Sequence, residues 1–147
     1  MYHRVEKQSL LPIETGISLS EITDSNQIPD FKDDYDEITL LYAIDNSREY
    51  FKKVKSYPDA FKSIGLPVTP MRSIATGEGF FPPGGLAFAV METEGQVEKS
   101  FFVLDHGTRS AINTAARIDV FCGIGKDALQ NAENLNTNGK LYYLLKR

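Results

Sequence analysis

The stretch LAFAVMETEGQVEKSFFVL, residues 86–104, decides the fold, because it has the pattern of a β-hairpin. Two apolar runs flank Glu94-Gly95, and a glycine at the second loop position supplies the positive φ that a tight primed turn needs. Pairing the arms symmetrically about this turn sets Phe88 opposite Phe101. Because side chains alternate along a strand, we expect one apolar face made of Leu86, Phe88, Val90, Val97, Phe101 and Val103.

The length and composition are those of an ordinary globular domain. The chain has 147 residues, of which 41% are hydrophobic and 24% charged, so wholesale disorder is excluded. The net charge of −4 and the absence of a basic stripe argue against a general nucleic-acid binder. We therefore expect one domain that does not bind nucleic acid.

The sequence shows no signal for export or for membrane insertion. The first 22 residues lack the apolar core of a signal peptide, and no run approaches the roughly 20 apolar residues of a membrane span. Cys122 is the only cysteine, so no intramolecular disulfide is possible. These features predict a soluble, cytoplasmic protein that does not bind membranes.

The N-terminal quarter has little periodicity. Residues 1–36 are interrupted by Pro12, Gly16 and Pro29, and we expect an arm packed over a single domain of residues 37–147. The acidic run DFKDDYDE, residues 30–37, is expected to be a solvated linker. A cation site is the alternative, although the calcium-loop pattern of glycine and closing glutamate is absent.

The middle of the chain predicts a strand followed by a helix pair. ITLLYAI, residues 38–44, is apolar on both faces, as a central strand would be. Ser47 is a suitable N-cap for a helix over residues 47–56, and Pro58 separates this helix from a second one that ends at residue 64. The helix pair is therefore expected to span residues 47–64.

The rest of the chain predicts further sheet strands and one more helix. Residues 68–75 form a weak strand that Pro70 would confine to an edge or a bulge, and residues 105–108 form a turn. Residues 116–124 form a strand, 127–135 a short helix, and 140–147 a closing strand. This order predicts an α+β fold: a mostly antiparallel, curved sheet of about five or six strands with the helices packed on it. A β-barrel carrying two helical insertions is the alternative.

A catalytic site could form around His106. This histidine follows Asp105 at the end of the hairpin, and Arg109 lies nearby in the sequence. A carboxylate can orient an imidazole that acts as a general base, but adjacent residues of a strand point to opposite faces. Asp-x-Gly is also ordinary turn chemistry, and this structural interpretation is favoured.

A second candidate is an anion site at Gly123, Gly125 and Lys126, where a predicted strand meets a predicted helix. Unpaired N–H groups at a helix start bind anions, but Val120 stands where the Walker pattern needs its first glycine. No metal site is predicted, because His3, His106 and Cys122 lack ligand spacing.

The segment TGEGFFPPGG, residues 76–85, places Phe80 and Phe81 directly before Pro82 and Pro83. The phenylalanines could fold into the core. Alternatively they could project as a rigid hydrophobic tip, since the prolines reduce the entropy lost on binding. Such a tip would suit a protein partner or a second subunit.

Three functional classes follow from these patterns. The lack of a catalytic constellation favours a small non-enzymatic interaction protein that binds or inhibits a protein partner, of an immunity or accessory type and from a virus or mobile element. The first alternative is a structural or assembly subunit that self-associates through its arm and the Phe80-Phe81 loop. The second is a small hydrolase using His106, acting on a phosphoester or glycosidic bond. No cofactor is predicted for any of them.

Overall fold

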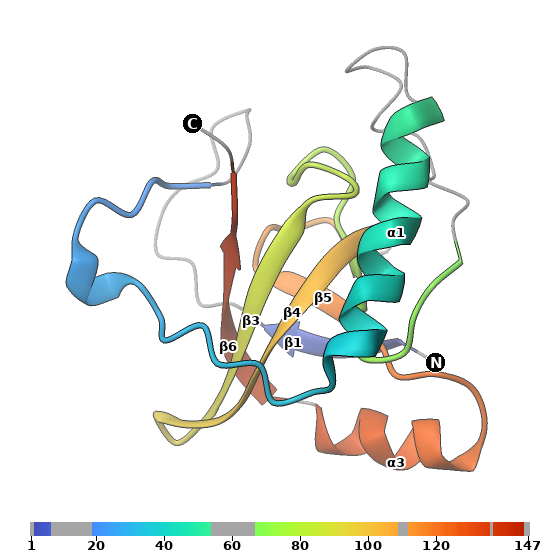
Figure 1. Cartoon of the computed structure of the whole chain (residues 1–147). Coiled ribbons are helices and arrows are strands. Elements are labelled where there is room, and N and C mark those ends of the chain that lie inside the picture. Colours follow the sequence, from blue (N-terminus) through green and yellow to red (C-terminus); the bar gives the residue numbers. More distant parts are fainter. Residues whose placement is uncertain (1, 7–18, 54–66, 109–111, 136, 146–147) are drawn as a thin grey trace.

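The predicted hairpin lies at the centre of the fold. Strands β3 (Leu86–Thr93) and β4 (Gln96–Thr108) are joined by Glu94 and Gly95, whose φ angles are 53° and 79° (Figure 1). These left-handed angles at both loop positions are those of a primed turn, so the predicted turn is confirmed. The computed structural model describes residues 2–6, 19–53, 67–108, 112–135 and 137–145.

The predicted register of this hairpin is wrong by one residue. Phe88 pairs with Phe102 rather than with Phe101, because the ladder shifts at a bulge after Met91. A slip of one residue exchanges the two faces of a strand. Ala89 and Phe101 therefore face the core. The rings of Phe88 and Phe102 lie on the outer face, with their centroids 4.9 Å apart.

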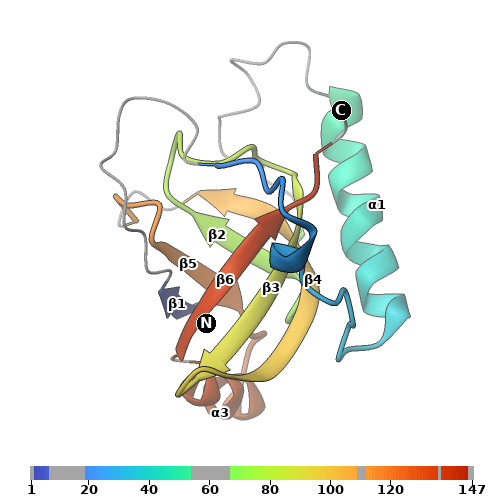
Figure 2. The same ribbon diagram turned by 90° about the vertical axis from the view of Figure 1, so that its left-hand side faces the viewer.

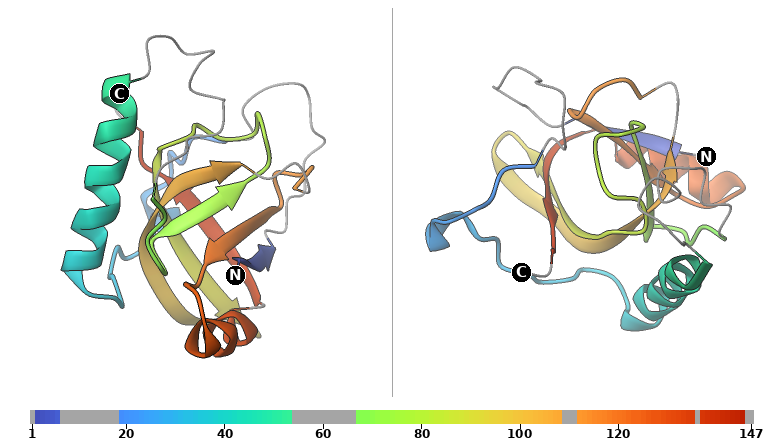
Figure 3. Two further views of the ribbon diagram at one scale, coloured as in Figure 1. Left: turned by 90° about the vertical axis from the view of Figure 1, so that its right-hand side faces the viewer. Right: turned by 90° about the horizontal axis from the view of Figure 1, so that it is seen from above.

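Six strands close into a barrel in the order β1-β5-β2-β4-β3-β6. The remaining strands are β1 (Tyr2–Glu6), β2 (Ser73–Thr76), β5 (Arg117–Phe121) and β6 (Thr137–Tyr143). Figure 3 shows the strands surrounding a common interior. Only the β1–β6 and β2–β4 pairs are parallel, so the predicted α+β class and mostly antiparallel pairing are confirmed.

Three predictions about the sheet need correction. β1 is part of the barrel wall, where it pairs with β5 and β6, so the first residues are not a separate arm. β2 is not an edge strand, because it lies between β4 and β5. Pro70 precedes this strand and therefore removes no donor from its ladder. The turn predicted at residues 105–108 is instead the last part of β4.

The strand predicted at residues 38–44 is wrong, because α1 spans Glu37–Lys53. A short apolar run does not distinguish a strand from a half-buried helix. The helix begins after Asp36, whose carboxylate accepts the backbone N–H of Thr39 at 2.9 Å and thereby caps the first turn. Ser47, expected as an N-cap, lies in the helix interior and faces the barrel. The second helix predicted up to residue 64 lies outside the described residues.

Helix α1 packs along the outside of the barrel, whereas α3 (Lys126–Asn134) covers the end where the β3–β4 turn lies (Figures 1 and 2). The short helix predicted over residues 127–135 is confirmed, and its Ala128, Ala132 and Leu135 join the buried core, whereas Leu129 is exposed. Its start differs, because Gly125 with φ 99° is the N-cap and no side chain caps the helix. Among the described residues, no helix is both long and apolar enough to cross a membrane.

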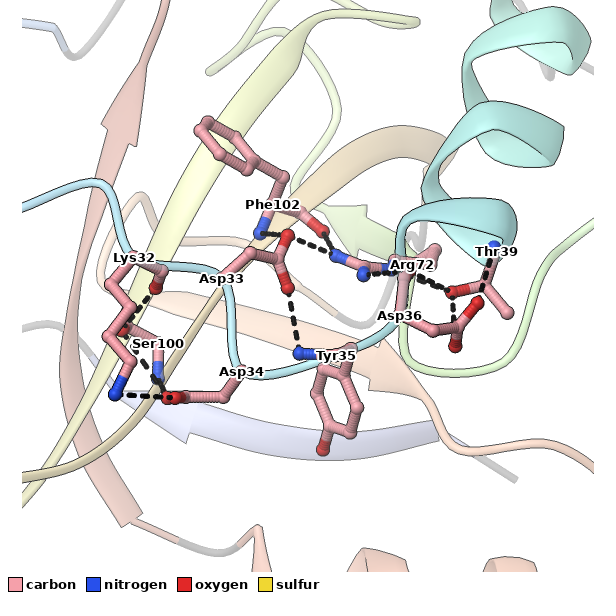
Figure 4. Close-up of polar contacts among 9 residues, drawn as sticks. All are labelled: Lys32, Asp33, Asp34, Tyr35, Asp36, Thr39, Arg72, Ser100 and Phe102. Carbon is pink, nitrogen blue, oxygen red and sulfur yellow. Dashed lines mark hydrogen bonds and ion pairs between the residues drawn. The ribbon is translucent and has the colours of Figure 1, made fainter.

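The acidic run at residues 30–37 is not a free linker, and among the described residues no three His, Cys, Asp or Glu side chains gather as a metal site would require. Figure 4 shows that the carboxylates of Asp33 and Asp34 point toward the backbone of β4. Asp34 accepts the backbone N–H of Ser100 at 2.7 Å, and Asp33 accepts that of Phe102 at 3.1 Å. The run therefore satisfies backbone donors of β4 that no neighbouring strand reaches.

Arg72 connects this run to the barrel. Its guanidinium is fully buried and donates to Asp33 at 2.6 Å, to the Asp36 carbonyl at 2.7 Å and to the Phe102 carbonyl at 2.9 Å (Figure 4). A buried cation needs a paired anion and further acceptors, and this arrangement provides both. The contact fixes residues 33–36 and hence the first turn of α1.

Candidate functional site

The most unusual polar group of the protein is the carboxyl of Asp105, near the end of β4. Asp105 is 1% exposed and pairs in register with Ile74 of β2, whose side chain belongs to the core. Neighbouring strands place registered residues on the same face, so the Asp105 side chain points into the barrel. The hairpin turn and α3 lie at the other end of β4.

The two carboxyl oxygens of Asp105 have different surroundings. Oδ2 accepts two hydrogen bonds, from the Thr76 hydroxyl at 2.8 Å and from the Tyr143 hydroxyl at 2.9 Å. Oδ1 is buried and has no hydrogen-bond partner in the described part of the chain. Burial raises the pKa of Asp105 to about 7, although the hydroxyls of Thr76 and Tyr143 and the backbone N–H of Gly107 oppose this shift. The proton of the neutral acid therefore belongs on Oδ1.

The aromatic ring of Tyr143 completes the site. Burial and the neighbouring Asp105 raise the pKa of the Tyr143 hydroxyl well above its ordinary value, so this group remains a donor. The ring stacks on that of Phe81, with centroids 5.2 Å apart and planes 9° apart. Gly85 lies against the same ring, since a Cβ at this position would be 3.1 Å from Tyr143 Cε1.

The loop between β2 and β3 folds inward rather than forming the projecting tip. Phe81 is 3% exposed, Pro83 is buried, and Phe80 and Pro82 are half-buried. Folding into the core was the favoured prediction for the phenylalanines, and it holds for Phe81. The assignment of Phe80–Pro83 as a partner-binding surface stays a prediction, but without Phe81 as its exposed anchor.

His106 and Asp105 are not brought together. Because β4 continues to Thr108, their side chains lie on opposite faces, and His106 points toward α1. Its Nε2 lies 2.8 Å from Ser47 Oγ, and its Nδ1 lies 2.8 Å from Ser73 Oγ. Burial lowers the pKa of His106 to about 4. Arg109, the third predicted member, lies outside the described residues.

The bonds around His106 determine its tautomer. Ser47 Oγ donates its only proton to the Gly84 carbonyl at 3.2 Å, so it accepts from Nε2, which carries the ring proton. Nδ1 then accepts the hydroxyl proton of Ser73, whose oxygen also accepts the backbone N–H of Thr69 at 2.9 Å. Every donor in this series of hydrogen bonds has an acceptor. The Ser47 hydroxyl is therefore not positioned as a nucleophile for His106 to activate.

A second buried carboxylate, Asp119, lies on the opposite face of the barrel wall. It follows the core residue Ile118 in β5, and Arg117 holds it with two hydrogen bonds of 2.9 and 3.1 Å. Asp119 is thus neutralised by a cation, unlike Asp105. The two carboxyl groups do not form an acid–base pair on one face.

The anion site predicted at the start of α3 stays a prediction. Gly123 is buried, whereas Gly125 and Lys126 are exposed, and Gly125 directly precedes the helix. Cys122 is buried in the core, which raises the pKa of its thiol, as expected for an inert residue. Over the described ranges, no three His, Cys, Asp or Glu side chains gather as a metal site would require.

Tyr143 also lines a groove. The groove encloses about 910 Å³ between residues 19–22, 28, 29 and 31 on one side and Glu92 of β3 with residues 138–145 of β6 and its extension on the other. Its walls combine apolar side chains, such as Ile28, with polar ones, such as Lys140. Because Tyr143 contributes to both, the groove and the Asp105 site share one aromatic residue.

One of the comparisons with known proteins identifies a family. A family model described as "3D domain" matches residues 72–145, about half of the chain. The chain belongs to the 3D domain family. The match contains Thr76, Asp105 and Tyr143, but it leaves out α1 and the acidic run. No match was found among curated proteins or solved structures.

Sequence analysis identified Asp105 but missed its partners within the 3D domain. Thr76 and Tyr143 lie 29 and 38 residues from Asp105 in the sequence, and only barrel closure brings their hydroxyls to one oxygen. Alternation in the closing strand carried a partial signal, because Leu141 and Tyr143 share its inner face. No local pattern indicated which strand would face Asp105.

Proposed function

We propose that this protein is an enzyme that cleaves a glycosidic bond, with Asp105 as its general acid. The observation that carries the proposal is the asymmetry of the carboxyl group: two donors at Oδ2 and no partner at the buried Oδ1. A general acid must hold a proton at neutral pH and present it away from its own supporting bonds. The pKa of about 7 fits the first requirement, and the free Oδ1 fits the second.

The chemistry requires two proton transfers, one from Asp105 and one back to it. Oδ1–H of Asp105 donates to the glycosidic oxygen as the bond from this oxygen to the anomeric carbon breaks, and the leaving sugar departs with a neutral hydroxyl. The negative charge left on Asp105 is then stabilised by the hydroxyls of Thr76 and Tyr143, which already point at Oδ2. A hydroxyl nucleophile completes the reaction at the anomeric carbon, and its proton returns to Asp105.

A glycosidic substrate fits these surroundings better than the phosphoester that the sequence left open. A phosphoester carries charge, and its transfer depends on cations or metal ions. The Asp105 site instead contains neutral hydroxyls and stacked rings, and Arg117 is occupied by Asp119 on the other face. Neutral donors beside aromatic rings are the groups that a sugar needs.

The test is cleavage of end-labelled oligosaccharides, with β-1,4-linked hexosamine and β-1,4-glucan chains as the first substrates. Wild type should cleave one of them, Asp105→Asn should lose at least about a hundredfold in kcat, and Asp127→Asn should behave as wild type. Asp127 is the matched control, because it is an exposed carboxylate in the first turn of α3. Full activity of a folded Asp105→Asn, or no cleavage by wild type, would refute the proposal.

A protein-binding function is our second proposal, and one surface feature favours it. The outer face of the first two turns of α1 exposes Ile38, Leu41 and Tyr42 at 64%, 52% and 66%. Adjacent exposed apolar side chains are typical of interaction surfaces. If this face mediates self-association, sedimentation should show a concentration-dependent oligomer that Leu41→Ser/Tyr42→Ser abolishes. A monomer at every concentration would remove the assembly form of this proposal.

A further inference from the structure

We propose that Ser47 and His106 are positioning residues that connect helix α1 to the Asp105 carboxyl through the loop at Gly84-Gly85. The inference rests on the proposed role of Asp105 as an acid. It assigns His106 a task different from the base predicted from the sequence. It also gives a function to α1, which lies outside the residues that match the 3D domain.

The connection begins at the buried face of α1. Ser47 donates its hydroxyl proton to the Gly84 carbonyl at 3.2 Å and accepts from His106 Nε2 at 2.8 Å. Ser73 of β2 fixes the other side of the same imidazole at 2.8 Å. Ser47 is 4% exposed and His106 is 3% exposed, so water does not replace these bonds. The imidazole thus holds α1, β2 and β4 at one spacing.

Gly84 transmits this position to Asp105. Its carbonyl binds Ser47, while its N–H donates to the Asp105 carbonyl at 2.6 Å, and the Asp105 N–H donates to the Gly85 carbonyl at 3.0 Å. Gly84 has a φ of 76°, and a Cβ here would lie 2.9 Å from Phe51 and 3.0 Å from Tyr50. Only glycine fits this conformation and this close approach to α1.

The same loop also positions the donor on the Asp105 side chain. Gly85 lies against the Tyr143 ring, and Phe81 stacks on its face, so a displaced loop would release this ring. Tyr143 then would not hold its hydroxyl 2.9 Å from Oδ2. Asp105 is therefore fixed twice from one loop, at its backbone and through its side-chain partner.

The experiment compares Ser47→Ala with Asn46→Ala. Asn46 is the matched control, because its side chain also donates from α1 to a backbone carbonyl, that of Pro67 at 3.1 Å. This bond is not among the hydrogen bonds that lead from Ser47 to Asp105. The first readout is the titration of the Asp105 carboxyl carbon by NMR in the full chain, assigned with Asp105→Asn. Ser47→Ala should lower the titration midpoint by about one pH unit or more, because the looser site admits water. Asn46→Ala should leave it unchanged.

The second readout is kinetic, on whichever oligosaccharide wild type cleaves. Ser47→Ala should lower kcat about tenfold or more with little change in KM, since a misplaced acid affects the transition state rather than binding. Ser47→Thr keeps the hydroxyl and should restore both readouts. If Ser47→Ala fails to fold, His106→Leu, which removes the donor toward Ser47, replaces it with the same expectation.

Two results would overturn the inference: an unchanged Asp105 titration in folded Ser47→Ala, or equal shifts in Ser47→Ala and Asn46→Ala, which would indicate general loosening of α1. The titration needs no activity, so the positioning role is tested even if wild type cleaves no substrate. If wild type cleaves no substrate but Ser47→Ala shifts the Asp105 titration, the proposed enzymatic function is refuted and the connection from α1 to Asp105 stands. Full activity of Asp105→Asn would likewise refute Asp105 as the acid and leave that connection standing.

Discussion

Replacing Asp105 by asparagine should reverse the pH dependence of stability at this site. The ordinary pKa of the carboxyl is 3.8, whereas burial raises it to about 7 in the folded protein. Between these values the folded state keeps a proton that the unfolded chain has released, so rising pH lowers stability by about 1.4 kcal/mol per pH unit. By neutral pH the free energy of unfolding has fallen by about 4 kcal/mol in total. The asparagine side chain does not ionise, so this loss is absent from Asp105→Asn.

His106 contributes the opposite trend. Its pKa falls from 6.5 to about 4 on folding, so below pH 6.5 the unfolded chain takes up a proton that the folded protein refuses. Falling pH therefore lowers stability, by about 3 kcal/mol over the whole interval. In the wild type the contributions of Asp105 and His106 nearly cancel between pH 4 and 6.5. Asp105→Asn removes one of them and should make stability rise steeply with pH.

The assay is urea unfolding at several pH values from 4 to 8, followed by circular dichroism because the chain has no tryptophan. The stability of Asp105→Asn relative to wild type should increase with pH and level off above pH 7. His106→Gln should show the opposite slope, and the double variant should be nearly as flat as the wild type. A pH-independent difference between Asp105→Asn and wild type would refute the protonated, buried acid.

Three further outcomes follow from the structure. Gly84→Ala should destabilise the fold by about 1–3 kcal/mol, because a Cβ is strained at φ 76° and meets Phe51, whereas Gly95→Ala, at φ 79° in open space, should cost only about 1 kcal/mol in the same urea assay. Asp33→Ala should cost about 3 kcal/mol, since it leaves the buried Arg72 without its anion, and Asp34→Ala only about 1 kcal/mol. Cys122 should react with a thiol reagent no faster than the protein opens, because its thiol is buried, and labelling of the native protein at the rate of a free thiol would contradict this.

The hairpin and the last helix could be predicted because their signals are local. Glu94-Gly95 specifies its own turn, and the spacing of Ala128, Ala132 and Leu135 defines one face of a helix. The register was not predictable in the same way, since the bulge after Met91 leaves no mark in the sequence. Both faces of β3 are apolar, and so the hydrophobic pattern did not select between neighbouring registers.

The strand predicted at residues 38–44 failed because the deciding contact is distant. Asp36 caps α1, and its carbonyl is held by Arg72, 36 residues further along the chain. The acidic run looked solvated for the same reason, since β4 supplies the N–H groups that Asp33 and Asp34 accept. A local pattern shows the charge of a segment, but not the donors that tertiary structure brings to it.

The assignment of roles to Asp105 and His106 depended on whether β4 continues through them. A turn there would have let the carboxylate orient the imidazole, and the expected site would have been a base at His106. The strand continues instead, and alternation sends the acid into the barrel and the histidine toward α1. One backbone feature thus separates two adjacent ionisable residues into a proton donor and a neutral hydrogen-bonding connection. Burial disfavours the charged form of each residue, so it raises the pKa of the Asp105 carboxyl and lowers the pKa of the His106 imidazole.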